Sequence, residues 1–229
     1  MNPFKVALYG YKPSEKTKQA VFAILEAISD VGGAVCIEAA FSSSLGVQVN
    51  DIPVFRQSSD LDPVTSLFVS FGGDGTMLKA TTFILDSGIP LVGVNTGRLG
   101  FLSTIDVAQV KKVITDFVAG AYTIEERTMV SLSTSPPIPE FEDISVALNE
   151  ITVSRKDTTA MITVATYLDG EYLTSYWADG LIIATPTGST GYSLSCGGPV
   201  MAPGTNSLIL TPIAPHNLNA RPLIIADHT

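Results

Sequence analysis

The first half of the chain alternates short apolar runs with longer stretches whose apolar residues recur at helical spacing. Strands are expected at residues 4–9, 34–37, 67–71 and 90–94, and helices at 14–29, 76–86 and 107–119. Ser14 can cap the first helix, and the polar stretch 41–56 is expected to be a connection. This alternation favours a Rossmann-like α/β domain over residues 1–121, with a mostly parallel sheet whose ligands bind beyond the carboxyl ends of the strands.

From residue 122 onward the pattern changes to short runs of threonine, valine, isoleucine and tyrosine without a helical period. Strands are expected at residues 129–133, 144–154, 161–168, 171–176 and 181–184. Asp169 and Gly170 join two of these strands and are typical of a type I′ hairpin turn. Residues 122–229 are therefore expected to form an antiparallel all-β domain, which makes the chain α+β overall.

Composition narrows the class of protein and its partners. The chain has 229 residues, of which 45% are hydrophobic, so it can bury a sizeable core. Its net charge is −9 and it has no dense Lys/Arg cluster, which argues against a nucleic acid or an anionic membrane as partner. No apolar run approaches the roughly 18 residues of a membrane span. Cys36 and Cys196 lie far apart without zinc-ligand spacing, so a reducing, cytoplasmic location is expected.

One stretch, LFVSFGGDGTMLK at residues 67–79, carries the strongest chemical signal. An apolar strand ends in Gly72-Gly73-Asp74-Gly75-Thr76, where backbone N–H groups can approach a phosphate without an intervening Cβ. An acid near a phosphate is costly unless it holds a metal or takes a proton from a hydroxyl nucleophile, and Asp74 is such an acid. The alternative is a plain strand-to-helix turn with Thr76 as helix N-cap.

A second stretch, TPTGSTGYS at residues 185–193, directly follows an apolar strand. Its hydroxyls and small residues suit a ligand that carries phosphates and riboses, and the alternative is a long polar surface loop. Asn149 and Glu150 are adjacent in a predicted strand, so both can serve one site only near a strand end or a bulge. Asp179 before the strand at 181–184 is weak evidence alone, because Asp-Gly is a common turn.

Together these motifs resemble the NAD kinase family, which uses ATP or polyphosphate. The GGDG loop alone is shared with phosphofructokinases and with diacylglycerol and sphingosine-type lipid kinases, whereas the long glycine-threonine-serine stretch is more specific. The motifs that carry the resemblance are GGDGT at 72–76, NTGRLGFL at 95–102, ALNE at 147–150, DGLIIATPTGSTGYSLSCGGP at 179–199 and PHNLNARPL at 215–223.

The resemblance implies roles for individual residues. Asp74 is implied to accept the proton of the adenosine-ribose 2′-hydroxyl of NAD, which then attacks the terminal phosphate of the donor. The implied contacts to the dinucleotide or its phosphates come from Gly75, Phe101, Asn149, Glu150, Asp179, Thr190, Gly191, Tyr192, Ser193, Leu194, Ser195 and the backbone of Ala214. Lys79, one helical turn past the loop, is a candidate phosphate ligand or a solvated helix lysine. Arg98 and His216 are secondary candidates.

The resemblance also bears on cofactors and assembly. The sequence shows no cluster of carboxylates that would predict a metal held by the protein. Mg²⁺ is therefore expected to bind together with the donor phosphates. A homo-oligomer is implied, often a tetramer formed through the β domains. Gly191 stands where many relatives carry alanine, and relatives usually continue past the position of Thr229, so the second domain is expected to be incomplete there. The rival functions are a lipid kinase and a non-catalytic dinucleotide sensor.

Overall fold

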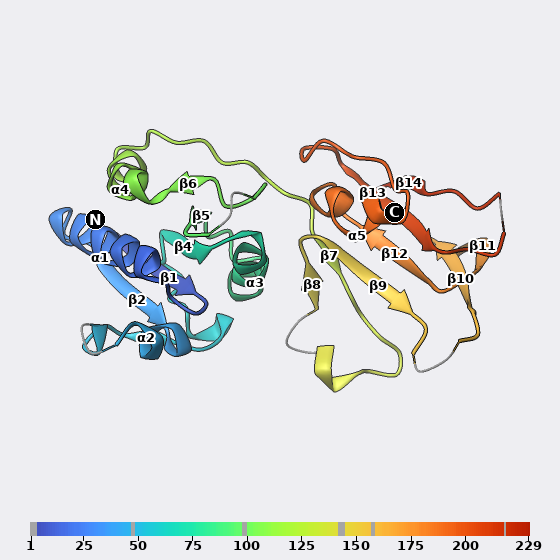
Figure 1. Cartoon of the computed structure of the whole chain (residues 1–229), viewed down its shortest axis with the longest axis horizontal. Helices are drawn as coiled ribbons and strands as arrows, with labels where there is room; N and C mark the ends of the chain where they lie inside the picture. Colours follow the sequence, from blue (N-terminus) through green and yellow to red (C-terminus); the bar gives the residue numbers. More distant parts are fainter. Residues whose placement is uncertain (1–3, 47–48, 98–99, 142–144, 157–158, 218) are drawn as a thin grey trace. The chain divides into compact units, whose positions relative to one another are not determined.

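The structure is a computed structural model that describes residues 4–46, 49–97, 100–141, 145–156, 159–217 and 219–229. Its internal contacts divide the chain into two units, Met1–Ile124 and Glu125–Thr229. Helices and a parallel sheet make up the first unit, and antiparallel strands dominate the second (Figure 1). The predicted fold class is therefore confirmed.

The first unit is built on one six-stranded sheet of order β3-β2-β1-β4-β5-β6, in which all neighbours pair in parallel. Its elements are β1 (Lys5–Gly10), α1 (Glu15–Asp30), β2 (Ala34–Glu38), α2 (Ala39–Leu45), β3 (Val54–Phe55), β4 (Leu67–Gly72), α3 (Asp74–Ile84), β5 (Leu91–Asn95), β6 (Ile105–Asp106) and α4 (Val110–Val118).

Both faces of this sheet are buried, which explains the almost continuous apolar strands. Along β1, Val6 and Leu8 point into the larger core, whereas Ala7 and Tyr9 point into the smaller one. Helices α1 and α4 lie side by side over the larger core, and α3 covers the opposite face (Figure 1). The central strand β4 thus runs between two apolar layers to the sheet edge where its loop begins.

Helix boundaries agree with the sequence in part. The Ser14 hydroxyl accepts the Thr17 N–H at 3.1 Å and caps α1, as predicted. The proposed N-cap role of Thr76 is wrong, because α3 already begins at Asp74 with Gly73 as its cap.

Two further stretches differ from the prediction. The expected connection at 41–56 contains α2, which Glu38 caps by accepting the N–H groups of the first turn, and Phe41 and Leu45 bury its inner face. The helix expected at 107–119 begins as a 3₁₀ turn, Val107–Gln109, before α4.

Antiparallel pairing organises the second unit into a four-stranded sheet of order β14-β13-β12-β9, a β10-β11 hairpin and a β7-β8 pair. Its elements are β7 (Val130–Ser131), β8 (Val146–Ala147), β9 (Glu150–Ser154), β10 (Ile162–Leu168), β11 (Glu171–Ala178), β12 (Gly180–Ala184), α5 (Tyr192–Ser195), β13 (Ser207–Ile213) and β14 (Leu223–Ala226).

The predicted turn between β10 and β11 fits its type, because Asp169 and Gly170 have φ values of 50° and 87° and a type I′ turn needs both positive. The strand expected at 144–154 is two strands, β8 and β9, separated at residues 148–149; its first residue lies outside the described residues. Within the described chain, no helix has both the length and the apolar character needed to cross a membrane.

Candidate functional site

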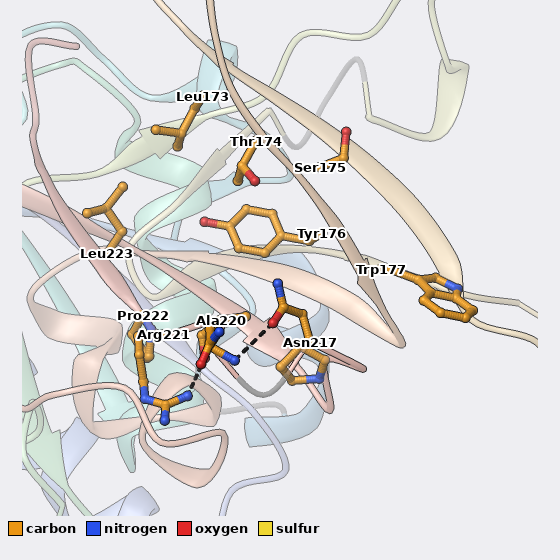
Figure 2. A pocket seen from close by; sticks show the side chains of 12 residues that line it. Leu173, Thr174, Ser175, Tyr176, Trp177, Asn217, Ala220, Arg221, Pro222 and Leu223 are labelled. Atoms are coloured by element: carbon orange, nitrogen blue, oxygen red, sulfur yellow. Dashed lines mark hydrogen bonds between the residues drawn. The ribbon is translucent and has the colours of Figure 1, made fainter.

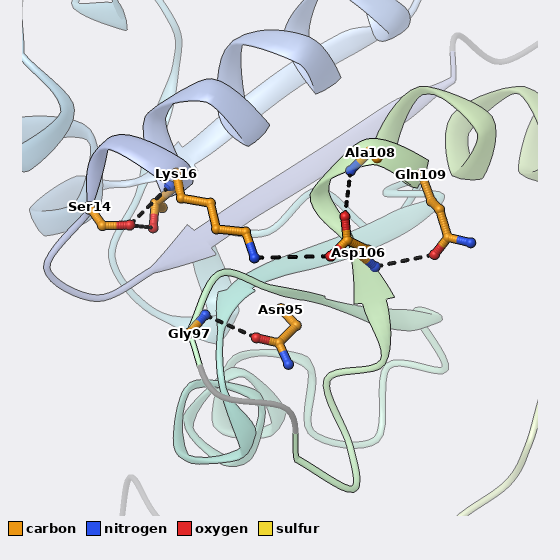
Figure 3. Close-up of polar contacts among 8 residues, drawn as sticks. Ser14, Lys16, Asn95, Gly97, Asp106, Ala108 and Gln109 are labelled. Carbon is orange, nitrogen blue, oxygen red and sulfur yellow. Dashed lines mark hydrogen bonds and ion pairs between the residues drawn. The ribbon is translucent and has the colours of Figure 1, made fainter.

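The glycine loop of the first unit follows β4 at the carboxyl edge of the parallel sheet. Gly72 pairs with Asn95, the last residue of β5, which in turn pairs with Asp106 of β6. Figure 3 shows polar contacts near this edge: the Asn95 side chain accepts the N–H of Gly97 at 2.9 Å, and Asp106 accepts that of Ala108. The glycine loop after β4 and the loop after β5 therefore both lie at the carboxyl edge of the parallel sheet, as predicted.

The carboxylate of Asp74 is the centre of this edge. Its Oδ2 accepts the N–H of Phe101 at 2.7 Å, and its Oδ1 accepts those of Leu102 and Ser103 at 2.9 and 3.1 Å. Burial acts to raise the pKa of Asp74, but the three backbone N–H groups stabilise the carboxylate, and its pKa lies below the ordinary value. Asp74 is therefore an ionised, oriented carboxylate at neutral pH.

These contacts leave the acid able to accept one more hydrogen bond. A carboxylate oxygen has two acceptor positions, so Oδ1 is saturated, while Oδ2 has one position that no described residue uses and that an incoming hydroxyl could take. Gly100 lies so close that a Cβ there would overlap the Asp74 carboxylate. The loop after β5 thus encloses the acid without covering it fully.

The other candidates of the first unit lie around this acid. Gly75 is exposed, with open space where a Cβ would point, and Lys79 is exposed one turn further along α3. The Phe101 side chain is 80% exposed, whereas its N–H binds Asp74. The resemblance assigned a role to this side chain and missed the backbone contact, which only the folded loop reveals. Arg98 lies outside the described residues.

In the second unit, Asn149 and Glu150 lie at the start of β9, where Glu150 forms the last pair with Ala184. The pair thus occupies a strand end, as a shared site requires. The Asn149 carbonyl accepts the Thr185 N–H at 2.8 Å, and a Cβ on Gly188 would overlap that same carbonyl. The TPTG turn therefore packs directly on the Asn-Glu pair, which sequence spacing alone did not indicate.

Glu150 is an unusual carboxylate. Its Oε2 is buried and has no hydrogen-bond partner among the described residues, and burial raises the pKa of Glu150. A Cβ on Gly191 would lie 3.2 Å from this oxygen and 3.7 Å from Nδ2 of Asn149. Gly191 therefore lies beside the adjacent pair Asn149 and Glu150, around an acceptor oxygen that has no donor among the described residues.

The glycine-threonine-serine stretch is not a polar surface loop, so that alternative is wrong. Residues 187–190 form a 3₁₀ turn and α5 follows, while Thr185, Ser189 and Ser193 are fully buried. The Ser193 hydroxyl lies 2.8 Å from that of Thr211. The hydroxyl of Ser193 therefore stabilises the interior, whereas the exposed members of the predicted set are Thr190, Tyr192, Leu194 and Ser195.

Asp179 immediately precedes β12 and forms an ion pair that the sequence did not predict. Its Oδ1 lies 2.9 Å from Nε of Arg155, and its Oδ2 accepts a hydrogen bond from Nη2 at 3.3 Å. The Arg155 N–H also donates to the Asp179 carbonyl at 3.0 Å. Both side chains are about 30% exposed, so the pair remains accessible.

The segment after β13 contains the remaining candidates. Ala214 is exposed and adopts a positive φ of 43°. The His216 ring packs against Trp177 with centroids 4.3 Å apart and an interplanar angle of 41°. Beside them lies a pocket of about 360 Å³, between Leu173–Trp177 of β11 and the segment 215–223 (Figure 2). Its described lining includes none of the residues that the resemblance implies as ligands.

No group of three or more His, Cys, Asp or Glu side chains that could hold a metal ion occurs in the described ranges. The site in the first unit offers one oriented carboxylate in a glycine loop. The site in the second unit offers polar groups and carboxylates on turns of small residues, and these groups can hydrogen-bond to sugar hydroxyls.

A glycine loop with one acid after the central parallel strand, followed by an antiparallel β unit, defines a kinase of the GGDG-loop class. Residues 45–122 match the ATP-NAD kinase N-terminal domain and residues 148–229 match the ATP-NAD kinase C-terminal domain. The chain belongs to the NAD kinase family. The predicted family is therefore confirmed.

Curated relatives and solved structures support membership of the same family. The NAD kinase of Flavobacterium psychrophilum is 49% identical over 98% of this chain and 78% of its own length, and that of Flavobacterium johnsoniae is 47% identical with the same coverage. Yeast NADH kinase complexed with NADH superposes with a TM-score of 0.81 at 28% identity, covering 98% of this chain and 70% of that one. An Archaeoglobus fulgidus NAD kinase in complex with ATP gives 0.71 at 30% identity, covering 97% and 77%.

Proposed function

We propose that this protein is an NAD kinase, which transfers the terminal phosphate of ATP, or of polyphosphate, to the 2′-hydroxyl of the adenosine ribose of NAD and so forms NADP. The observation that carries the proposal is the Asp74 carboxylate, oriented by three backbone N–H groups within the glycine loop and open to one further donor. Membership of the NAD kinase family supplies the identity of the acceptor.

Asp74 is proposed as the proton acceptor. The 2′-hydroxyl would donate to the open position on Oδ2, which aligns its oxygen lone pair with the phosphate to be transferred. The low pKa of Asp74 makes it a weak base, and this suits a phosphoryl transfer whose transition state is loose and needs little deprotonation of the nucleophile early on. Its main contribution is therefore orientation.

The donor phosphates are proposed to bind at the glycine loop. Gly75 has open space where a Cβ would point, so a phosphate can approach its backbone, and the dipole of α3 favours negative charge at this end of the helix. Lys79 is exposed on the same helix and would add a positive charge. The Phe101 side chain is exposed beside Asp74, which supports a role in contacting the dinucleotide.

The second unit is proposed to bind NAD. Glu150 has a buried acceptor oxygen and no donor from the described chain, and a ribose hydroxyl or an amino group of the ligand would supply one. Asn149 and Asp179 would add further polar contacts. The proposed wrapping segment consists of the exposed residues Thr190, Tyr192, Leu194 and Ser195 and the half-buried Gly191, with the buried Ser193 supporting them. Ala214 is proposed to contribute its backbone.

Mg²⁺ is proposed to enter with the donor phosphates as part of the substrate. The Asp74 carboxylate accepts three N–H bonds and has little capacity left for a cation, which agrees with this proposal. When bound, the ion neutralises negative charge on the phosphates. A homo-oligomer and a cytoplasmic location are proposed on the family resemblance and on the composition of the chain.

The direct test incubates the full-length protein with NAD and Mg-ATP and measures NADP with an NADP-dependent dehydrogenase. We expect NADP to form, and we expect Asp74→Asn to lose most of that activity. NAD binding by calorimetry without turnover would instead identify a dinucleotide sensor. Phosphorylation of diacylglycerol or a sphingoid base, with none of NAD, would identify a lipid kinase.

A further inference from the structure

Asp179 has a fixed backbone and a side chain with one conspicuous partner. Its N–H donates to the Ile213 carbonyl at 2.9 Å and its own carbonyl accepts the Arg155 N–H, so the strands on both sides hold its Cα in place. The remaining freedom of Asp179 is rotation of its side chain. Arg155, directly opposite on the continuation of β9, meets that side chain.

The contact is two-pronged. Nε of Arg155 lies 2.9 Å from Oδ1 of Asp179 and Nη2 lies 3.3 Å from Oδ2, so two guanidinium nitrogens contact the two carboxylate oxygens. This arrangement uses one acceptor position on each oxygen and leaves the other free. Two acceptor positions that no other described residue uses, on a carboxylate held at both oxygens, suit a pair of adjacent hydroxyls, such as those of a ribose.

The charge of Asp179 also reaches the proposed wrapping segment. The pKa of the Tyr192 phenol is raised first by burial, then by Cys196, and further by the negative charge of Asp179. The carboxylate therefore lies within electrostatic range of a residue that the resemblance implies as a dinucleotide contact.

We infer that Arg155 is a positioning residue for dinucleotide binding, because it orients the Asp179 carboxylate toward the ligand. This inference rests on the proposed function. Arg155 itself is not proposed to touch the ligand, and the donor phosphates are proposed to bind at the glycine loop of the first unit. Its loss should therefore weaken binding of NAD and leave binding of the phosphate donor unaffected.

The test compares Arg155→Gln with Lys156→Gln in the full-length protein. Lys156 is the exposed neighbouring cation, so its variant controls for the loss of one positive charge. We expect Arg155→Gln to raise the KM for NAD about tenfold, as loss of a charge-assisted contact would, with the KM for ATP within about twofold of the parent. Lys156→Gln should match the parent in both constants.

A double-mutant cycle separates positioning from general structure. In an Asp179→Asn background, adding Arg155→Gln should raise the KM for NAD by less than about twofold, because the partner through which Arg155 acts is already neutral. Effects that multiply independently would overturn the inference. If Arg155→Gln lowers the unfolding temperature strongly, Arg155→Lys is measured instead, and we expect an intermediate KM because lysine keeps the charge and loses the two-pronged geometry.

The outcomes distinguish this inference from the proposed function. A parent protein that forms no NADP removes the proposed function and the inference with it. If the parent is active and the Arg155→Gln and Lys156→Gln variants have the same KM for NAD, only the inference about Arg155 is wrong.

Discussion

The Asp74 carboxylate lies against the Cα of Gly100, so closely that any side chain on Gly100 would collide with it. The three residues after Gly100 then donate their N–H groups to the same carboxylate. A loop from β5 thus wraps around an acid from the end of β4, and the glycine makes this approach sterically possible.

Gly100→Ala is therefore expected to displace the acid. The added methyl group must push Asp74 or the loop away, which should destabilise the fold by about 1–3 kcal/mol and lower kcat by about 10- to 100-fold. The matched control is Gly97→Ala in the same loop, where a Cβ meets nothing within 4 Å. Steady-state assays and thermal unfolding check both. Equal activity of the two variants would contradict the steric argument.

Asp74→Asn tests the proposed base. An asparagine keeps the size of the side chain but removes the charge that three N–H groups stabilise, and it cannot accept the hydroxyl proton. We expect kcat to fall by about 10²- to 10⁴-fold, because the neutral amide would neither orient the hydroxyl as the carboxylate does nor take its proton. Asp86→Asn, an exposed acid just after α3, is the control and should retain parental activity. An Asp74→Asn variant within about threefold of the parent would exclude Asp74 as the base.

Gly188→Ala tests the packing of the TPTG turn on the Asn-Glu pair. A Cβ at this position overlaps the Asn149 carbonyl, so either the turn or β9 must shift. We expect a loss of stability of about 1–3 kcal/mol, or more, and weaker NAD binding, measured by chemical unfolding and calorimetry. Gly204→Ala has open space around its Cβ and should leave both quantities unchanged. Parental NAD affinity in Gly188→Ala would show that the turn does not position Asn149.

The pH dependence of stability follows from Glu150. Its folded-state pKa is raised by burial, so its contribution to stability is complete below the pKa of the unfolded chain and is lost as the pH rises through the folded pKa. Glu150→Gln removes the buried charge and should unfold at a higher temperature than the parent at pH 8, with a smaller difference near pH 4. Glu171→Gln, an exposed glutamate of the same unit, is the control. A difference that does not change with pH would contradict this account.

Local sequence patterns were sufficient for most of the architecture. Apolar runs predicted β1, β2, β4 and β5 of the parallel sheet, and the Asp169-Gly170 pair predicted the hairpin turn, because these features depend on neighbouring residues. The two-residue edge strands β3 and β6 were not predicted, because runs this short carry no periodicity. The pattern failed at α2. Three consecutive serines obscure its helical period, and its stability comes from Glu38 as cap and from burial of Phe41.

The candidate site was predictable as a set of residues but not as an arrangement. Asp74 and the Asn149-Glu150 pair stand out by residue type, since acids are unusual beside glycine-rich turns and inside apolar strands. Nothing local indicates that the hydroxyl of Ser193 points inward to Thr211 while Leu194 points outward. That choice depends on which face of a short helix packs against β13.

The sequence by itself determined the succession of an α/β unit and a β unit, the family, and the identity of the candidate residues, because each is encoded in runs of adjacent positions. Only the tertiary structure decided that the N–H groups of residues 101–103 orient Asp74, that Gly188 packs on Asn149, and that Arg155 orients Asp179. The physical reason is distance along the chain: these partners are more than twenty residues apart, and their contacts arise when separate strands end at the same edge of a sheet or pair side by side.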